Sequence, residues 1–460
     1  MNQVGEMALK YAAGEDVVFD QQLVQYECLT NQAHVVMLKK QGLISSLVAK
    51  KLVAGLEEIK KLDQQGKFKL KPELEDVHSN VEQWLIDKLG IEIGGWLRLG
   101  IARNDQVYTD TRMWLKDELL VVAKELVSLM TGLVKVAKQH TKTVMPGYTH
   151  WRVSQPITYG HWLTAKAYHF GDDLSHILTT FDSINSCPLG IFEMAGTHLP
   201  LDRQLTAKLL GFARVTPNSL YTANQRGELE IKLLADLSLL ALHIRRTMNE
   251  VIIWSSHEFG LVKVDDLYTS GGTAQPNLKN PDVLEVVRAK MAGIWGKLVT
   301  LLAIMDPLPS GYNRDTQATK PVIFEAIKDM QQALPVVEGI LTSLKPDKQR
   351  MVKVAGMNFS VAPDVAVQLA VEDGISFRQA YQKVKLMIGK GKKLKLSPKA
   401  AALGHVSPGG SAPAEVKKQI KQLKQQFQVV GKKIGEKETL IKEGWKLLEQ
   451  EVGKLIKEEL

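Results

Sequence analysis

Three short polar clusters carry side chains that could bind and transform an anionic ligand. They read Glu75-Asp76-Val77-His78, Ala102-Arg103-Asn104-Asp105-Gln106 and Pro146-Gly147-Tyr148-Thr149-His150. A guanidinium and an amide can hold a carboxylate, and an imidazole can move a proton beside it. Each cluster adjoins the predicted end of a long helix, so the helices could bring all three to one carboxylate-bearing ligand.

Each cluster taken singly also has a simpler explanation. Asp76 or Asn104 could cap a helix, and His78 or His150 could be a hydrogen-bonded structural histidine. Their joint occurrence at helix ends favours a binding site.

A polar loop at residues 268–285 separates two apolar helical segments. It is rich in Thr, Ser, Gly, Gln, Pro and Asn and reads Tyr-Thr-Ser-Gly-Gly-Thr-Ala-Gln-Pro-Asn-Leu-Lys-Asn-Pro-Asp before a helix start. Such a run buries too little apolar surface to offset its ordering entropy, so we predict a mobile surface loop. Loops of this length in a compact domain are usually lids or binding loops.

The elements that must position these side chains are long helices. Apolar residues recur at three- and four-residue spacing over 113–137, and similar helices are predicted over 157–184 and 227–255. Each is apolar on more than one face, which predicts a central bundle completed by partner subunits. Strand signals at Val17-Val18 and Ile91-Glu92-Ile93 are too short to build a sheet. We therefore expect an all-α protein with an N-terminal lobe (1–105), a central bundle domain (106–352) and a small C-terminal lobe (353–460).

Composition is that of an ordinary globular protein of 460 residues, 45% of them hydrophobic and 24% charged. The two cysteines, Cys28 and Cys187, have no zinc or disulfide spacing, which fits a reducing cytoplasm. No signal peptide or membrane span is expected. The net charge of +9 is concentrated in a Lys-rich C-terminal third without interleaved aromatic residues. That pattern argues against nucleic-acid binding and is compatible with a small anionic substrate.

The motifs, in their order along the chain, resemble those of argininosuccinate lyase, in the fumarase/aspartase superfamily. The resemblance covers nearly the whole length. It rests on Glu-Asp-Val-His (75–78), Arg-Asn-Asp-Gln (103–106), Gly-Tyr-Thr-His (147–150), Pro-Leu-Gly with Ala-Gly-Thr (188–197), Lys-Asn-Pro-Asp (279–282), Tyr-Asn-Arg-Asp (312–315), Phe-Arg-Gln-Ala (377–380) and Gly-Gly-Ser-Ala-Pro (409–413). Eight motifs in one order are far more specific than any single motif.

The resemblance implies a three-lobed fold with a long helical bundle, in a homotetramer whose active sites each combine three chains. It implies a β-elimination that converts argininosuccinate to arginine and fumarate, without a cofactor or a metal. Such a reaction needs a cationic and amide cradle for the carboxylate, a base near Cβ and an acid near the leaving nitrogen.

The resemblance also assigns roles to single residues. His150 and Glu285 match a charge relay, although a carboxylate in a first helical turn is also favoured by the macrodipole. The residues matched to substrate binding are His78, Arg103, Asn104, Thr149, Asn280, Tyr312, Gln317 and Lys320. For Tyr312 and Lys320, a turn tyrosine and a solvated lysine are the simpler alternatives.

Departures from the family pattern are concentrated around the expected chemistry. Gly272 stands where the signature loop has its catalytic serine, and Leu278 stands where it has a lysine. Glycine cannot accept a proton, and leucine cannot stabilise an alkoxide or a carboxylate. The other departures are Thr30-Asn31, Ile101-Ala102, Arg152, Tyr221, Thr273 and Gln275.

Three interpretations remain open from the sequence. The chain could be an argininosuccinate lyase whose base is Thr273 or Ser270 after a shift of the loop. It could be a lyase for a different amino-acid-like or dicarboxylate-like substrate. It could also be a catalytically impaired homologue with a structural or regulatory role, although the retained His150, Glu285, Arg103 and Lys320 argue against that.

Overall fold

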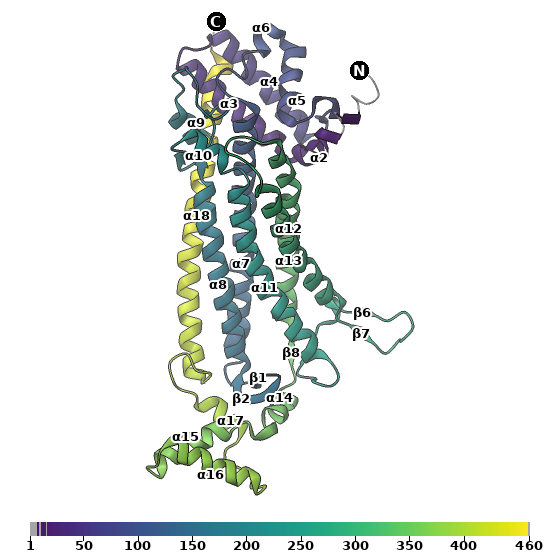
Figure 1. The fold of residues 1–460 in the computed structure, drawn as a ribbon, viewed down its shortest axis with the longest axis vertical. Helices are drawn as coiled ribbons and strands as arrows, with labels where there is room; N and C mark the ends of the chain where they lie inside the picture. The colour runs from purple at the N-terminus through teal and green to yellow at the C-terminus, as the bar shows by residue number, and fades with distance from the viewer. Residues whose placement is uncertain (1–6, 9–10, 15, 459–460) are drawn as a thin grey trace.

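Long helices dominate the computed structural model, which describes residues 7–8, 11–14 and 16–458 (Figure 1). The chain begins in a helical lobe at one end of a long bundle. The elements of this lobe are α2 (Asp16–Asp20), η1 (Gln21–Leu23), α3 (Val24–Lys40), α4 (Ser46–Gln64), η2 (Pro72–Leu74), α5 (Val77–Leu89) and α6 (Ile91–Gly94). The two segments that carry weak strand signals in the sequence are therefore helical, as α2 and α6.

Six helices run along the bundle, and their facing surfaces form one apolar core. They are α7 (Arg103–Gln139), α8 (Tyr159–Ile184), α11 (Glu228–Ser255), α12 (Asp282–Met305), α13 (Thr319–Ser343) and α18 (Pro413–Lys457). Helix α7 packs against α8, α13 and α18, and α11 packs against α8 and α12. The three long helices predicted from apolar spacing are α7, α8 and α11.

Helix α7 begins at Arg103, ten residues before the start predicted from its apolar spacing. Its first turns are polar but buried, with Asp105, Gln106, Asp110 and Arg112 all inaccessible to solvent. The Asp105 carboxylate accepts a hydrogen bond from the backbone N–H of Ala102 and so closes the first turn. Polar residues that face the N-terminal lobe therefore extend the helix beyond its apolar stripe.

The strands are short and form only two-stranded pairs among the described residues. An antiparallel hairpin, β1 (Val144–Thr149) and β2 (Arg152–Thr158), joins α7 to α8 and was not predicted. The other strands are β3 (Ser186–Cys187), β4 (Arg214–Val215), β5 (Val262–Lys263), β6 (Ser270–Gly271), β7 (Lys279–Asn280) and β8 (Lys345–Pro346). The predicted all-α class is confirmed.

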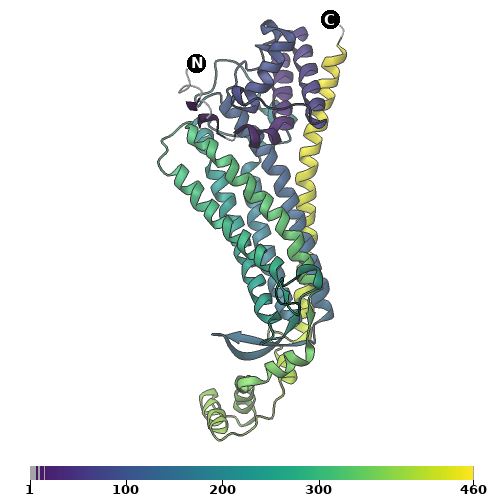
Figure 2. The same cartoon turned by 90° about the vertical axis from the view of Figure 1, so that its right-hand side faces the viewer.

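After α13 the chain leaves the bundle and then returns to it. Beyond the end that carries β1 and β2 lie α14 (Lys348–Ala355), α15 (Ala362–Glu372), α16 (Phe377–Gly389) and α17 (Pro398–Gly404). Helix α18 then runs back along the bundle to the N-terminal lobe, as Figure 2 shows in yellow. No helix in the described part of the chain is long and apolar enough to cross a membrane. Cys28 and Cys187 are buried thiols.

Candidate functional site

A cavity of about 380 Å³ lies between the N-terminal lobe and the adjoining end of the bundle. Of the eight residues predicted to bind substrate, this cavity brings together His78, Arg103, Asn104, Tyr312, Gln317 and Lys320. They come from three segments that are far apart in the sequence. The structure therefore gathers most of the predicted binding residues into one site.

The first turns of three helices line this cavity. Asp76 caps α5 by accepting a hydrogen bond from the backbone N–H of Ser79, which places His78 in the first turn. Arg103 and Asn104 open α7, and Lys320 lies in the first turn of α13 after the short helix η4 (Arg314–Ala318). Helix N-termini favour negative charge, so this arrangement suits an anionic ligand.

His78 is held by a buried network of polar side chains. Its Nδ1 lies 2.7 Å from Oε2 of Glu27, and Glu27 also accepts a hydrogen bond from the Asn31 amide at 2.6 Å. The Thr30 hydroxyl donates to Asp110 at 2.5 Å. Two of the residues that depart from the family pattern, Thr30 and Asn31, thus contact the two carboxyl groups that lie beside His78.

The same network shifts the pKa values of its members. Burial alone lowers the pKa of His78, but the charge and hydrogen bond of Glu27 outweigh burial and raise it. Burial alone raises the pKa of Glu27, but the charge and hydrogen bond of His78 outweigh the effect of burial, so the pKa of Glu27 is lowered. Burial and the Glu27 charge raise the pKa of Asp110 well above its ordinary value. His78 therefore keeps its proton to higher pH than an ordinary histidine, and Asp110 keeps its proton to higher pH than an ordinary aspartate.

These three residues are also the one group in the described part of the chain with ligand atoms close enough to hold a metal ion. The 2.7 Å separation between His78 and Glu27 is that of a hydrogen bond. The donor set therefore fits a shared-proton network better than a metal centre.

Two cationic groups of the cavity, Lys320 and Arg103, are paired with carboxylates of the same chain. Lys320 Nζ lies 2.6 Å from Asp20 and 3.1 Å from Asp16, and Lys320 is almost fully buried. Arg103 Nη1 lies 3.0 Å from Asp76. The buried position of Lys320 excludes the simple alternative of a solvated lysine. A ligand that binds these cations must share them with internal acids.

Two further pairings involve residues predicted to bind substrate. The Asn104 amide donates to the Glu193 carboxylate at 2.7 Å. The Gln317 side-chain oxygen accepts a hydrogen bond from Arg314 Nε at 2.9 Å. The structure thus adds Glu193 and Arg314 to the polar groups around the predicted binding residues.

Sequence reasoning missed several residues that line the cavity. Arg226 is 6% exposed, and its Nη1 atom has no hydrogen-bond partner among the described residues. Its guanidinium lies 5.2 Å from the centre of the Tyr312 ring. The other residues missed are Asp20, Arg98, Val107, Phe192 and Glu193. Glu193 lies inside the 188–197 motif region, which was a usable signal, whereas nothing in the sequence marked Asp20.

Thr149 and His150 lie at the opposite end of the bundle, at the tip of the β1–β2 hairpin (Figure 1). Both are exposed, and His150 and Trp151 adopt the positive φ values of a tight turn. The 37 residues of α7 separate this hairpin from Arg103. At 1.5 Å per residue the separation is about 55 Å. Within one chain these two predicted residues therefore do not join the cavity.

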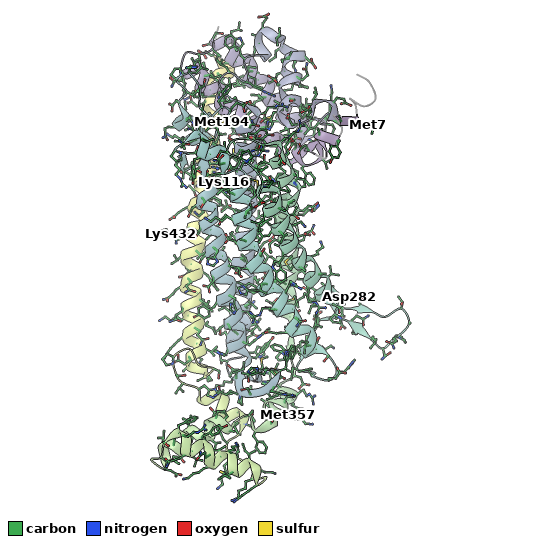
Figure 3. All side chains as sticks on the ribbon, in the orientation of Figure 1. Met7, Lys116, Met194, Asp282, Met357 and Lys432 are labelled. Atoms are coloured by element: carbon green, nitrogen blue, oxygen red, sulfur yellow. The ribbon has the colours of Figure 1, made fainter. Side chains whose placement is uncertain are left out.

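The polar loop at residues 268–285 carries a third group of predicted site residues. Strands β6 and β7 pair Ser270 with Asn280 at its base, and the loop projects from the side of the bundle. Figure 3 labels Asp282 near this base, and Met194 beside the upper end of the bundle. Helix α12 has 24 residues, or about 36 Å, between the loop and its far end near the first cavity. The loop and the first cavity are therefore also apart.

The predicted loop residues have their own surroundings. Ser270 donates its hydroxyl hydrogen to Asp282 at 2.5 Å, and Thr273 is exposed. Asn280 and Glu285 line a second cavity of about 670 Å³. Thus one chain presents three separate groups of predicted residues, at the first cavity, the hairpin and the loop.

Comparison with known proteins identifies the family. Residues 12–296 match a family model described as Lyase. The chain is 39% identical over 370 residues to argininosuccinate lyase of Acetivibrio thermocellus, covering 80% of each chain. It is 34% identical over 448 residues to argininosuccinate lyase of Chelativorans sp., covering 92% of this chain and 94% of the relative.

Solved structures show the same fold. EDDS lyase in complex with formate has a TM-score of 0.86 at 24% identity, over 95% of this chain and 93% of that one. Class II fumarase from Schistosoma mansoni has a TM-score of 0.70 at 15% identity, over 84% and 91%. The fumarase/aspartase-like fold predicted from the motifs is confirmed, and the chain belongs to the argininosuccinate lyase family of carbon–nitrogen lyases.

Proposed function

We propose that this protein cleaves argininosuccinate to arginine and fumarate, in the cytoplasm. A base removes the Cβ proton beside a carboxylate, and the electron pair forms an aci-carboxylate intermediate. Breakage of the C–N bond then releases fumarate, and protonation of the leaving nitrogen gives arginine. The observation that carries the proposal is the convergence of His78, Arg103, Asn104, Tyr312, Gln317 and Lys320 on one cavity.

In this reaction the first cavity supplies the binding groups. Protonated His78, Arg103 and the Asn104 amide stabilise the carboxylate that accumulates negative charge. Tyr312, Gln317 and Lys320 contact the remaining polar groups of the substrate. The reaction needs no cofactor and no metal.

The protein works as a homotetramer in which three chains contribute to each site. The separation of the cavity, the hairpin and the loop within one chain supports this assembly, because a small substrate cannot span about 36 to 55 Å. In the tetramer, His150 and Thr149 of one chain and Asn280 and Glu285 of another adjoin the cavity of a third. The divisions at residues 105 and 352 remain the proposed domain boundaries.

The catalytic base in this proposal is Thr273 or Ser270. Thr273 is exposed in the projecting loop, whereas the Ser270 hydroxyl already donates to Asp282. Neither hydroxyl stands at the position of the family's serine, which Gly272 occupies, so either base is poorly placed. Loss of a general base typically costs about 100- to 10,000-fold in rate. Turnover of argininosuccinate should therefore be slow.

A second candidate is a lyase for a different amino-acid-like or dicarboxylate-like substrate, or a homologue with little activity and a structural or regulatory role. The observation that favours it is the joint presence of Gly272 and Leu278 in the loop and of Glu193 on Asn104.

Release of fumarate from argininosuccinate, followed by ultraviolet absorbance, tests the proposal. Detectable turnover abolished by His150→Asn supports it. Absence of turnover together with absence of thermal stabilisation by argininosuccinate contradicts it, because a ligand that prefers the folded state must raise the melting temperature. Stabilisation without turnover identifies a binding-competent but impaired homologue.

A further inference from the structure

The carboxylate of Glu193 accepts a hydrogen bond from the side-chain amide of Asn104 and so uses one of the two N–H donors of that amide. Nδ2 of Asn104 donates to Oε2 of Glu193 at 2.7 Å, and both residues line the first cavity. The proposed function places a substrate carboxylate against Asn104. One internal carboxylate therefore contacts the same amide group that the proposed function assigns to a carboxylate of the ligand.

The backbone on the N-terminal side of Glu193 is anchored to the start of α7. The Asp105 carboxylate accepts hydrogen bonds from the backbone N–H groups of Gly190 at 2.9 Å and Phe192 at 3.1 Å. Asp105 is buried and directly follows Asn104 in the chain. Phe192 has a φ of 57°, in the left-handed region that costs energy for a residue with a side chain. The loop is thus held in a specific, strained conformation beside Asn104.

The backbone on the C-terminal side of Glu193 is anchored as well. The Ser219 hydroxyl donates to the backbone oxygen of Met194 at 2.7 Å. The backbone N–H of Gly196 donates to the oxygen of Ile191 at 3.0 Å and closes the loop. Figure 3 labels Met194 in this region. Because both flanks are fixed, Glu193 stays close to Asn104 although its own side chain is exposed and can rotate.

Glu193 also differs from the other carboxylates of the cavity in its charge balance. Asp20 pairs with Lys320, Asp76 pairs with Arg103, and Glu75 lies 3.4 Å from Arg314. Within the described residues, no Lys, Arg or His nitrogen lies within ion-pair distance of Glu193, and its hydrogen-bond donor is a neutral amide. Glu193 is therefore a carboxylate of the cavity without a direct ion-pair partner in the described part of the chain, although the guanidinium of Arg226 lines the same cavity.

We propose that Glu193 competes with ligand carboxylates for Asn104 and lowers the affinity of this cavity for dicarboxylates. The inference rests on the proposed function, because it takes Asn104 as a carboxylate-binding group. A dicarboxylate must displace the Glu193 side chain or bind beside a like charge, and either step weakens binding. Glu193 is thus a specificity-determining residue that favours ligands presenting a hydrogen-bond donor or a cation at this position.

Isothermal titration with fumarate tests this inference on the full-length protein. We expect Glu193→Ala to bind fumarate about tenfold or more tightly than the unmodified protein, which corresponds to about 1.4 kcal/mol. Glu193→Gln should lie between them, because it removes the charge and keeps a group that can bond to Asn104. The matched control is Glu92→Gln, which neutralises an exposed carboxylate on α6 away from the cavity.

Salt dependence separates charge repulsion from a change of loop structure. Raising the ionic strength screens the repulsion by Glu193, so it should strengthen fumarate binding to the unmodified protein relative to Glu193→Gln. A purely structural effect would give parallel salt dependences. Circular dichroism melting curves identify any variant that is not folded, and Glu193→Gln preserves the size of the side chain if Glu193→Ala unfolds.

The outcomes distinguish this inference from the proposed function. Equal fumarate affinity in the unmodified protein and both Glu193 variants overturns the inference and leaves the proposed function standing. Tighter binding by the variants without turnover of argininosuccinate supports the inference and counts against the proposed substrate. Absence of fumarate binding by every folded variant rejects the inference, and argininosuccinate turnover then decides the function separately.

Discussion

His78 and Glu27 form a buried pair at the wall of the first cavity, with Nδ1 of His78 2.7 Å from Oε2 of Glu27. The two side chains are 2% and 0% exposed. Nε2 of His78 has no hydrogen-bond partner among the described residues, and His78 lines the cavity. Glu27 thus holds the imidazole in place and stabilises its protonated form.

Replacing Glu27 by Gln should destabilise the fold by about 3 kcal/mol, because it leaves His78 buried without its anionic partner. The raised pKa of His78 gives a contribution that is fully present below its ordinary value of 6.5 and is lost as pH rises through the raised value. The lowered pKa of Glu27 gives a contribution that is present above 4.5 and is lost as pH falls through the lowered value. The difference in the free energy of unfolding between the unmodified protein and Glu27→Gln should therefore be largest between pH 4.5 and pH 6.5.

Denaturant unfolding of the unmodified protein and Glu27→Gln across this pH range measures the effect. Glu57→Gln is the control, since Glu57 lies in the same lobe and pairs with Lys60 instead. A pH-independent difference between the two proteins would show that the charge of the pair does not stabilise the fold.

Restoring the two missing groups of the loop should raise activity. The double variant Gly272→Ser with Leu278→Lys should increase fumarate release from argininosuccinate by about 100-fold or more if base loss limits the rate. A Cβ at position 272 would lie 3.0 Å from the backbone oxygen of Gln275, so the exposed loop must shift slightly. Each single variant serves as a control. No gain in a folded double variant would point to another substrate or another loop conformation.

Assembly should depend on the exposed apolar face of α12. Val299 is 65% exposed and Leu302 is 49% exposed, on a helix that faces away from the core at these positions. Light scattering should report a tetramer for the unmodified protein and a smaller species for Val299→Glu with Leu302→Glu, because burying a charge in an interface is costly. Val429→Glu on α18 is the control, with a valine 58% exposed. A monomeric unmodified protein would contradict the shared site.

The burial of Lys116 should make the free energy of unfolding increase between neutral and alkaline pH. Lys116 is buried in α7 and donates to the backbone oxygen of Gly211 at 2.5 Å, and burial lowers the pKa of Lys116 to about 7. Between pH 7 and the ordinary value of 10.5 the unfolded chain binds more protons, so stability rises with pH. Each unit of difference between the pKa of Lys116 in the folded and in the unfolded chain is worth about 1.4 kcal/mol. Lys116→Met should flatten this rise in thermal unfolding, whereas the exposed Lys135→Met should not.

Close packing of α18 against the 210–212 turn should tolerate no side chain at Gly444. A Cβ there would lie 2.5 Å from the backbone nitrogen of Gly211. Gly444→Ala should therefore destabilise the protein by about 1 to 3 kcal/mol. Gly453 lies on the same helix with no atom within 4 Å of such a Cβ, so Gly453→Ala should be neutral or stabilising by up to about 1 kcal/mol. Equal shifts of the denaturation midpoint would refute this contact.

The sequence alone predicted the class of fold, the long helices and the family. Apolar spacing is a local property, so α8 and α11 begin and end within two residues of their predicted limits. It failed at the start of α7, where buried polar residues extend the helix, and at the β1–β2 hairpin, whose strands are defined by pairing with each other. The ordered motifs identified six residues that line the first cavity.

Only the tertiary structure decided which predicted residues meet. The motifs do not specify the distance between residues. The resemblance assigned His150 and Arg103 to one site, but within one chain the 37-residue helix α7 separates them. The structure also added Arg226, which lies just before α11, and Glu193, which an anchored loop brings to Asn104. Such contacts depend on how the long helices pack and how the loops between them are anchored, which the one-dimensional pattern of residues does not contain.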